Sequence, residues 1–387
     1  MARIVGARAV RSTAVSTAEV QEGADRTFSD AVIGWQKRHG RHMLPWQNTR
    51  DAYRIWLSEI MLQQTQVAAV IPYYTRFLQR FPDVQSLAAA SSEEVMAHWS
   101  GLGYYSRARN LYRCAQRVVA EYNGMFPDDP ALLADLPGIG RSTAAAIAAF
   151  AYGRRAAILD GNVKRVFARV FGVDGYPGAK PVEDRLWQRA EALLPASDID
   201  AYTQGLMDLG ATLCTRSKPS CSTCPLAGRC VALATDRVHE LPVSKPRKAI
   251  PEKSTAMLVV VDRRQVLLER RPGSGIWGGL LSLPEVSCPD CVDVFDAEIT
   301  QVLKPFGAPS GREPLLPFTH GFTHFKLHVQ PYRIALARRF EHAGQDTHVW
   351  LDVEKLADAP LPAPVKKLLL AIFGEADLFA CAGSERL

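Results

Sequence analysis

Four cysteines near the middle of the chain constrain its fold more than any other feature. Cys214, Cys221, Cys224 and Cys230 are separated by six, two and five residues, so four thiolates can converge on one centre within a compact loop. Zinc usually binds thiolates as two close pairs, whereas only the middle two cysteines form a close pair here. The spacing favours an iron–sulfur cluster, and a zinc site and an unliganded loop are the alternatives.

The rest of the composition is that of a globular protein with more than one domain. At 387 residues the chain exceeds one usual core, so we expect about two or three domains. No apolar run approaches the roughly 20 residues of a membrane span, so we expect no membrane contact. The net charge of +6 permits a polyanionic partner without identifying one. Half of the eight cysteines share one loop, so we expect a reduced, cytoplasmic setting.

Hydrophobic periodicity divides the chain into a helical part and an α+β part. In residues 28–235 apolar side chains recur mainly at helical spacing, and prolines separate short helices. Residues 236–255 are polar, basic and rich in proline, which is typical of an exposed linker. Residues 256–387 contain alternating runs that predict strands and end in a helix near 365–373. Residues 1–27 have the composition of a transit peptide or a disordered tail, and we favour the tail.

A glycine-rich turn at residues 136–143 is a candidate phosphate-binding site. Gly138 and Gly140 let the backbone turn tightly before an alanine-rich helix. Free amides at the turn and at the helix N-terminus can bind a phosphate oxygen regardless of base sequence. A Pro-Gly turn without any ligand is the alternative, since such turns are common.

The order of these features resembles the helix-hairpin-helix DNA glycosylases with an iron–sulfur loop. The hairpin at 136–143 is followed by Asp160-Gly161-Asn162 and then by the cysteine loop at 214–230. The resemblance implies one four-iron, four-sulfur (4Fe-4S) cluster on the four cysteines. It also implies DNA contacts by Gly138, Gly140 and Ser142 of the hairpin.

Two further segments resemble the adenine-specific, MutY-type branch of this superfamily. They are Trp-Leu-Ser-Glu-Ile-Met-Leu-Gln-Gln-Thr at 56–65 and Gly-Leu-Gly-Tyr-Tyr at 101–105. The resemblance implies a multidomain protein: an all-α helix-hairpin-helix glycosylase domain at 28–235, then an α+β, Nudix-like domain at 256–387 that reads the opposite base. It implies a monofunctional hydrolase that excises adenine mispaired with 8-oxoguanine or guanine in base excision repair. The implied partner is double-stranded DNA with an adenine mispair, bound by a monomer in the nucleoid of a bacterial cytoplasm.

The chemistry needs a proton donor for the adenine and a group that stabilises a cationic sugar. Glu59 lies among apolar residues of a helical stretch, where partial burial favours the protonated form of a general acid. By resemblance Glu59 is the catalytic acid, Asp160 stabilises the sugar cation, and Asn162 orients the sugar side. The alternatives are a solvated helix face for Glu59 and a helix N-cap for Asp160.

The main rival is a lyase of the endonuclease III type, which attacks with a lysine amine. Its lysine belongs two residues after the second glycine of the hairpin, where this chain has Ser142. We therefore expect a hydrolase, although Lys164 leaves weak lyase activity open. A third alternative is a DNA-binding or redox module without catalytic activity. Such a module would need neither Glu59 nor Asp160, and this chain has both.

Reading of the opposite base falls, by resemblance, to two further groups of residues. Gln64 and Tyr104 match positions that wedge into the base stack beside the emptied site. Phe322-Thr323-His324 lies where the family usually has Phe-Ser-His, the loop that recognises 8-oxoguanine. A polar helix face and a core tyrosine are the ordinary interpretations of the first pair.

The sequence also offers candidates for an adenine pocket and one further class of function. Trp46, Gln47 and Gln204 are candidates for an adenine pocket. The C-terminal half also resembles the approach to a Nudix box, which would suggest pyrophosphate hydrolysis. No helix with clustered glutamates follows Glu285, so we expect no magnesium site there.

Overall fold

The computed structural model describes residues 17–246, 249–273, 275–287, 292–340 and 347–374. Within them the chain forms two compact units. Unit 1 contains the described residues up to Trp56, then Pro127–Asp135 and Ile139–Lys245, and unit 2 contains Leu57–Phe126, Leu136–Gly138 and the described residues from Pro246 onward. The helical part, expected as one domain at 28–235, therefore contributes to both units, and the break before Pro246 falls inside the expected linker at 236–255.

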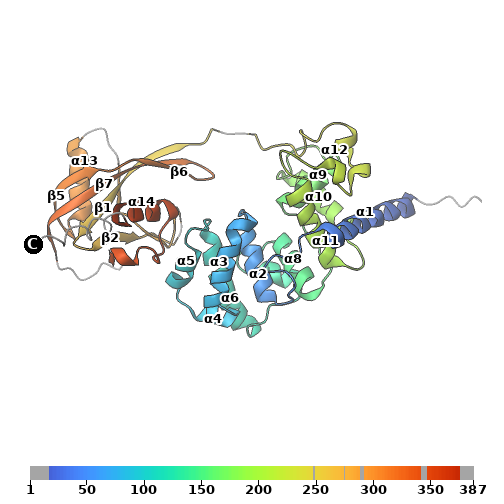
Figure 1. Ribbon diagram of the computed structural model, residues 1–387, viewed down its shortest axis with the longest axis horizontal. Helices are drawn as coiled ribbons and strands as arrows, with labels where there is room; N and C mark the ends of the chain where they lie inside the picture. Colours follow the sequence, from blue (N-terminus) through green and yellow to red (C-terminus); the bar gives the residue numbers. More distant parts are fainter. Residues whose placement is uncertain (1–16, 247–248, 274, 288–291, 341–346, 375–387) are drawn as a thin grey trace, which may run out of the picture. The chain divides into compact units, whose positions relative to one another are not determined.

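Unit 1 is helical (Figure 1). Its elements are α1 (Thr17–His39), α7 (Pro130–Asp135), α8 (Arg141–Tyr152), α9 (Gly161–Val170), α10 (Lys180–Ala192), α11 (Ile199–Asp208), the π-helix η1 (Leu209–Leu213), the 3₁₀ turns η2 (Cys221–Thr223) and η3 (Ala227–Arg229), and α12 (Val231–Ala234). Phe28, Phe167 and Phe171 form an aromatic group in its core, with ring centroids 5.7–6.0 Å apart. This core fixes α1 against α9, the helix that begins directly after Asp160.

The N-terminal helix begins earlier than expected. We predicted a disordered tail at 1–27, but α1 starts at Thr17. Buried Phe28 and Val32 anchor the helix, and once a helix is anchored each added residue costs little because nucleation is already complete. Residues 1–16 lie outside the described residues.

The helical elements of unit 2 follow one another closely in sequence. Helix α2 (Ala52–Leu62) crosses the break between the units, and α3 (Val67–Arg80), α4 (Val84–Ala89), α5 (Ser92–Trp99) and α6 (Ser106–Tyr122) follow it. Phe77 of α3 contacts Phe81 and Trp99 with ring centroids 4.8 and 6.2 Å apart. None of the described helices has the length and apolarity needed to cross a membrane.

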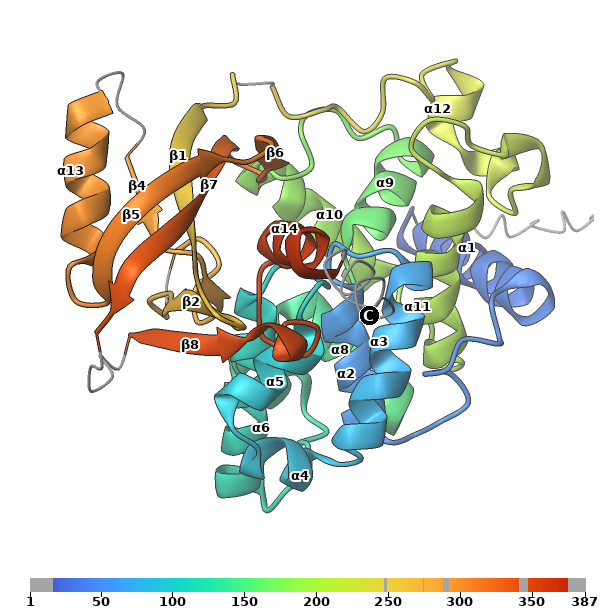
Figure 2. The same cartoon turned by 60° about the vertical axis from the view of Figure 1, so that its left-hand side comes forward.

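The remainder of unit 2 is a mixed sheet with helices (Figure 2). Its elements are β1 (Glu252–Asp262), β2 (Gln265–Arg270), β3 (Leu281–Ser282), β4 (Glu285–Val286), α13 (Val292–Leu303), β5 (Gly307–Pro314), β6 (Phe318–Gly321), β7 (Lys326–Arg339), β8 (His348–Asp352), the 3₁₀ turn η4 (Val353–Lys355) and α14 (Ala363–Gly374). The order β3-β2-β1-β7-β5 is antiparallel except for the parallel pair β1 and β7. Helix α13 packs on the sheet through Phe295, Ile299 and Leu303.

The predicted strands and closing helix are confirmed. Apolar residues at 256–261 and 266–268, within the part expected to contain strands, lie in β1 and β2, and Leu327 and Val329 are buried in β7. The expected linker is more structured than its composition suggested, since Val238 and Leu241 are buried against Ala232 and β1 already begins at Glu252. Prolines and charges there had hidden these two apolar anchors.

Candidate active site and DNA interface

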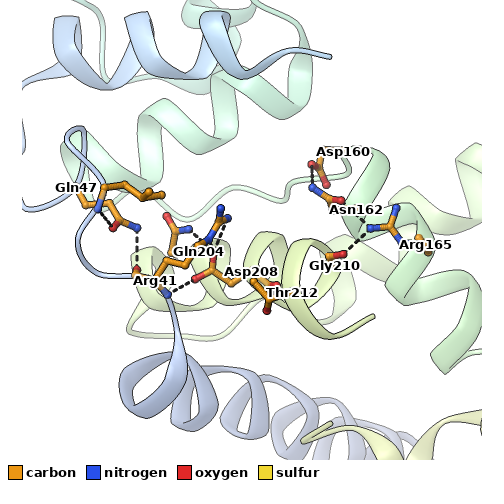
Figure 3. A network of polar contacts seen from close by, with 10 residues as sticks. Arg41, Gln47, Asp160, Asn162, Arg165, Gln204, Asp208, Gly210 and Thr212 are labelled. Carbon is orange, nitrogen blue, oxygen red and sulfur yellow. Dashed lines mark hydrogen bonds and ion pairs between the residues drawn. The ribbon is translucent and has the colours of Figure 1, made fainter. Parts of the chain in front are cut away.

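Asp160 and Asn162 form a hydrogen-bonded pair at the start of α9 (Figure 3). The Asp160 Oδ1 atom accepts from the Val163 amide at 2.7 Å, which makes Asp160 the N-cap of the helix, and its Oδ2 atom accepts from Asn162 Nδ2 at 3.2 Å. Arg165 Nη2 donates to Asn162 Oδ1 at 2.8 Å and to the Gly210 carbonyl at 2.6 Å. Asn162 is thus oriented, with its amide toward the carboxylate and its carbonyl toward the guanidinium.

The position of Gly210 in the π-helix η1 permits this arrangement. A Cβ atom on Gly210 would lie 2.5 Å from Asn162 Cβ and 3.0 Å from its backbone, so any larger residue would displace the start of α9. Burial raises the pKa of the Asp160 carboxyl, and the backbone amides of Val163 and Asn162 oppose this shift. The N-cap geometry is confirmed, and burial leaves this carboxylate with a raised pKa in a partly buried position.

Glu59 lies in the penultimate turn of α2. Its neighbours Leu57, Ser58 and Ile60 are buried, and Glu59 itself is half-buried. The partial burial that the sequence predicted for Glu59 is therefore present. Glu59 belongs to unit 2 and Asp160 to unit 1.

Arg107 is a buried, hydrogen-bonded residue beside the candidate DNA interface that the sequence analysis missed. It is 7% exposed, and its guanidinium donates to five carbonyls near the end of α2 and in the turn before α6. The partners and distances are Ile60 (3.0 Å), Met61 (2.7 Å), Gln63 (2.6 Å), Leu102 (3.4 Å) and Gly103 (3.1 Å). Desolvation by burial lowers the pKa of Arg107 to about 10. An arginine in an amphipathic helix normally suggests a solvated face, so only the tertiary structure shows this role.

Gln64 and Tyr104 are the residues directly after Gln63 and Gly103, whose carbonyls Arg107 binds. Both are exposed and adopt left-handed backbone conformations, with φ of 55° and 49°. They line one cavity of about 190 Å³ together with Arg107 and Gly138. Left-handed conformations of non-glycine residues are strained and cluster at functional sites. Three of the predicted DNA-contacting residues, Gln64, Tyr104 and Gly138, line this one cavity.

Only the first glycine of the hairpin has a conformation that favours glycine, since Gly140 has φ of -87° in extended backbone. Gly138 has φ of 80°, and a Cβ atom there would lie 2.8 Å from Asn110 Cβ. Gly140 is the N-cap of α8 and lacks a side-chain cap, so the first amides of α8 have no side-chain acceptor from this residue. Ser142 has a structural bond, since its Oγ accepts from the Leu159 amide at 3.0 Å. This bond ties α8 to the residue before Asp160.

The four cysteines line one cavity of about 30 Å³. Arg169 donates from Nη1 to Cys214 Sγ at 3.4 Å. Within the described part of the chain, no three His, Cys, Asp or Glu side chains are placed to hold a single metal ion. Four thiol side chains that line one cavity are a donor set that can hold a thiolate-bound metal centre.

The Phe322-Thr323-His324 loop connects β6 and β7. Thr323 and His324 are exposed, whereas Phe322 stacks on Phe325 with ring centroids 4.5 Å apart. The indole ring of Trp277, from the turn before β3, lies 5.6 Å from the Phe322 ring. Phe322 thus anchors the loop, while Thr323 and His324 stay exposed and contact each other through Thr323 Oγ1 and His324 Nδ1 at 3.5 Å.

A second polar network surrounds Asp208, which is fully buried in α11 (Figure 3). Its carboxylate accepts from the Arg41 amide at 2.8 Å, from Arg41 Nε at 2.7 Å and from Gln204 Nε2 at 2.8 Å. Gln47 Nε2 donates to the Arg41 carbonyl at 2.9 Å. Gln47 and Gln204, both predicted as weak pocket candidates, belong to this network, whereas Trp46 is buried. Asp208 and Arg41 had no local signal because 167 residues separate them.

Comparison with known proteins identifies both parts of the chain. A family model for HhH-GPD superfamily base excision DNA repair proteins matches residues 57–192, and a NUDIX domain model matches residues 255–371. The expected fold class is therefore confirmed.

Curated relatives cover nearly the whole chain. The adenine DNA glycosylase of Buchnera aphidicola subsp. Schizaphis graminum is 36% identical over 348 residues, which are 88% of this chain and 97% of that protein. The human adenine DNA glycosylase is 33% identical over 419 residues, covering 93% of this chain and 76% of the human protein. A solved thermostable thymine-DNA glycosylase covers 57% of this chain and 100% of its own, with a TM-score of 0.51 and 29% identity.

Proposed function

The chain belongs to the adenine DNA glycosylases, and on that premise we propose that it excises adenine mispaired with 8-oxoguanine or guanine by hydrolysing the N-glycosidic bond. The observation that carries the chemistry is the Asp160–Asn162 pair, a partly buried carboxylate oriented at the start of α9. The reaction is the first step of base excision repair, and its substrate is double-stranded DNA with one adenine mispair.

In this mechanism Glu59 donates a proton to a ring nitrogen of adenine, which turns the base into a neutral leaving group. The bond between that base and the sugar C1′ then breaks, and the Asp160 carboxylate stabilises the resulting oxocarbenium-like cation. Asn162 orients the sugar. Glu59, now deprotonated, accepts a proton from the water that attacks C1′, so the enzyme returns to its starting state.

Burial near Asp160 has a direct consequence for this mechanism. A carboxylate in a dehydrated site interacts more strongly with a developing positive charge than the same group in water does. The raised pKa of Asp160 is the cost of this placement. The group must remain ionised to act, so we expect excision to decline as the pH falls through the raised pKa.

Hydrolysis without strand cleavage follows from Ser142. A lyase of this superfamily would carry its amine nucleophile at this position, whereas the Ser142 hydroxyl accepts a hydrogen bond from the Leu159 amide. The hydroxyl therefore positions the segment before Asp160 and supplies no Schiff-base chemistry. We propose a monofunctional glycosylase.

The remaining residues bind DNA and the cofactor in this proposal. Gln64 and Tyr104 enter the base stack beside the extruded adenine, and the amides around Gly138 and Gly140 hold a backbone phosphate. Phe322, Thr323 and His324 contact the opposite base. Cys214, Cys221, Cys224 and Cys230 hold a 4Fe-4S cluster, which when bound supplies a rigid core for this loop. The protein acts as a monomer.

The first test is excision from labelled duplexes that place adenine opposite 8-oxoguanine, guanine or thymine, with and without alkali. Alkali-dependent cleavage opposite 8-oxoguanine, and little opposite thymine, supports the proposal. Alkali-independent nicking at oxidised pyrimidines would instead indicate the lyase.

The Glu59→Gln variant tests the acid role. We expect it to retain DNA binding and to lose single-turnover excision by about 10²–10⁴-fold, the usual contribution of acid–base catalysis. Glu121, an exposed glutamate that pairs with Arg117 on α6, provides the matched Glu121→Gln control, for which we expect wild-type rates.

A further inference from the structure

Helix α6 is bonded to a turn that lies far from it in sequence. Arg109 Nη1 donates to the Gly278 carbonyl at 2.5 Å. Two other contacts join the same parts of unit 2: Ser100 Oγ donates to the Leu361 carbonyl at 2.8 Å, and Arg270 pairs with Glu93 at 3.1 Å. The Arg109 bond is distinct because Arg109 lies on α6 five residues after Tyr104.

The turn at residues 275–280 is built to approach this helix closely. Gly279 has φ of 79°, and a Cβ atom there would lie 4.0 Å from Arg109 Cδ and 3.9 Å from Met96 Cε. A Cβ atom on Gly278 would lie 3.0 Å from the Pro272 carbonyl oxygen. The glycines therefore fold the turn tightly, so that its backbone faces the side chains of α5 and α6.

Trp277, the residue before these glycines, connects the turn to the β6–β7 loop. It is buried, with a strained φ of 52°. Its ring lies 5.8 Å from His320 and 5.6 Å from Phe322, and these two rings meet edge to face at 4.7 Å. The His320 ring therefore contacts both Trp277 and Phe322, and Trp277 also packs directly against Phe322.

From these contacts we propose that Arg109 is a positioning residue for recognition of the opposite base. Through the Gly278 carbonyl and the Trp277 ring it fixes the Phe322-Thr323-His324 loop relative to α6, whose preceding turn carries Tyr104. The Phe322-Thr323-His324 loop and Tyr104 are then held at a fixed position relative to each other. The inference rests on the proposed function, because it assumes that this loop reads the opposite base.

The electrostatics of Arg109 fit a positioning role rather than a surface role. Burial lowers the pKa of its guanidinium, and the nearby Arg113 lowers it further. A partly buried cation next to a like charge is unfavourable unless a bond such as that to Gly278 compensates for it. Arg113, one helical turn further along, is exposed, so it provides a control of equal charge on the same helix.

The test compares Arg109→Gln, Arg109→Lys and Arg113→Gln in the full-length protein with its cluster. Single-turnover excision is measured for adenine opposite 8-oxoguanine and opposite guanine, and the ratio of the two rates is the readout. A hydrogen bond from a charged donor is strong enough that we expect Arg109→Gln to lower this ratio about tenfold. Arg109→Lys should restore part of it, and Arg113→Gln should match the wild type.

A merely structural contact would lower both rates together and leave the ratio unchanged, which would overturn the inference. Hydrogen exchange of the amides at 318–326 provides a readout that needs no activity. Exchange should accelerate in Arg109→Gln and not in Arg113→Gln, and equal exchange in both would also refute the inference. A wild-type protein that shows no preference for 8-oxoguanine would instead refute the proposed function of the loop.

Discussion

Substitution of Arg107 tests whether one buried cation organises the two strained residues of the candidate DNA interface. Nη1 and Nη2 of its guanidinium share their four hydrogens among six acceptors, which are the carbonyls of Ile60, Met61, Gln63, Leu102 and Gly103 and Thr65 Oγ1. None of these acceptors is charged. Arg107→Lys keeps the charge and offers at most three donors, so about half of the acceptors lose their partner.

The expected magnitude follows from this count. A hydrogen bond to a charged group contributes roughly 1.5–3 kcal/mol, but neighbouring bonds are not additive and water replaces some of them. We therefore expect Arg107→Lys to lower the free energy of unfolding by about 2 kcal/mol and Arg107→Gln by about 3–5 kcal/mol, because the second change also removes the charge that six dipoles solvate.

Urea unfolding measures the loss of stability, and single-turnover excision at saturating enzyme measures the loss of activity. We expect excision to fall in Arg107→Lys even at temperatures where the variant is fully folded, because the backbone before Gln64 and Tyr104 is no longer held. Arg113→Lys is the control on the same helix. If Arg107→Lys unfolds like this control and excises adenine at the wild-type rate, Arg107 is not an organising residue.

Three further predictions concern the other polar groups. Burial raises the folded pKa of Asp160, so stability falls as the pH rises from the unfolded value near 3.9 through the raised one. Asp160→Asn keeps an N-cap acceptor without this charge and should equal or exceed the wild type in unfolding free energy at neutral pH while losing excision. Asp208→Asn leaves the Arg41 cation without its buried partner and should cost about 3–5 kcal/mol in urea unfolding, whereas Asp198→Asn, in an exposed pair, should cost less than about 1 kcal/mol. Cys224→Ala should lower the iron bound per protein relative to the wild type, and unchanged iron would refute the assigned ligand set.

The sequence predicted those features of the fold that depend on local pattern. The hairpin glycines, the Asp160 N-cap and the strands of the C-terminal part each have signals within a few residues, and the structure contains them all. The convergence of the four cysteines also follows from a short loop. In the helical part, by contrast, periodicity alone gave no sign that residues 57–126 cluster with the C-terminal part rather than with unit 1.

The residues that the sequence analysis missed are all polar groups with distant partners. Arg41 and Asp208 meet across 167 residues, and Arg109 and Gly278 across 169. Arginine and aspartate are mostly exposed in proteins, so a single sequence gives no reason to bury them. Only the folded arrangement shows that these charges have partners inside the protein.

The backbone conformations of Gln64 and Tyr104 link stability to function in this protein. A left-handed conformation at a non-glycine residue costs roughly 1–3 kcal/mol, and a glycine at either position would avoid most of that cost. The Arg107 guanidinium bonds the carbonyls of Gln63 and Gly103, the residues directly before these two. The same buried cation therefore offsets the strain at both positions, and this explains why two exposed side chains of different types are held at the rim of one cavity. A fold selected for stability alone would need neither the strain nor the buried charge, so their coexistence supports the role of this rim in binding DNA.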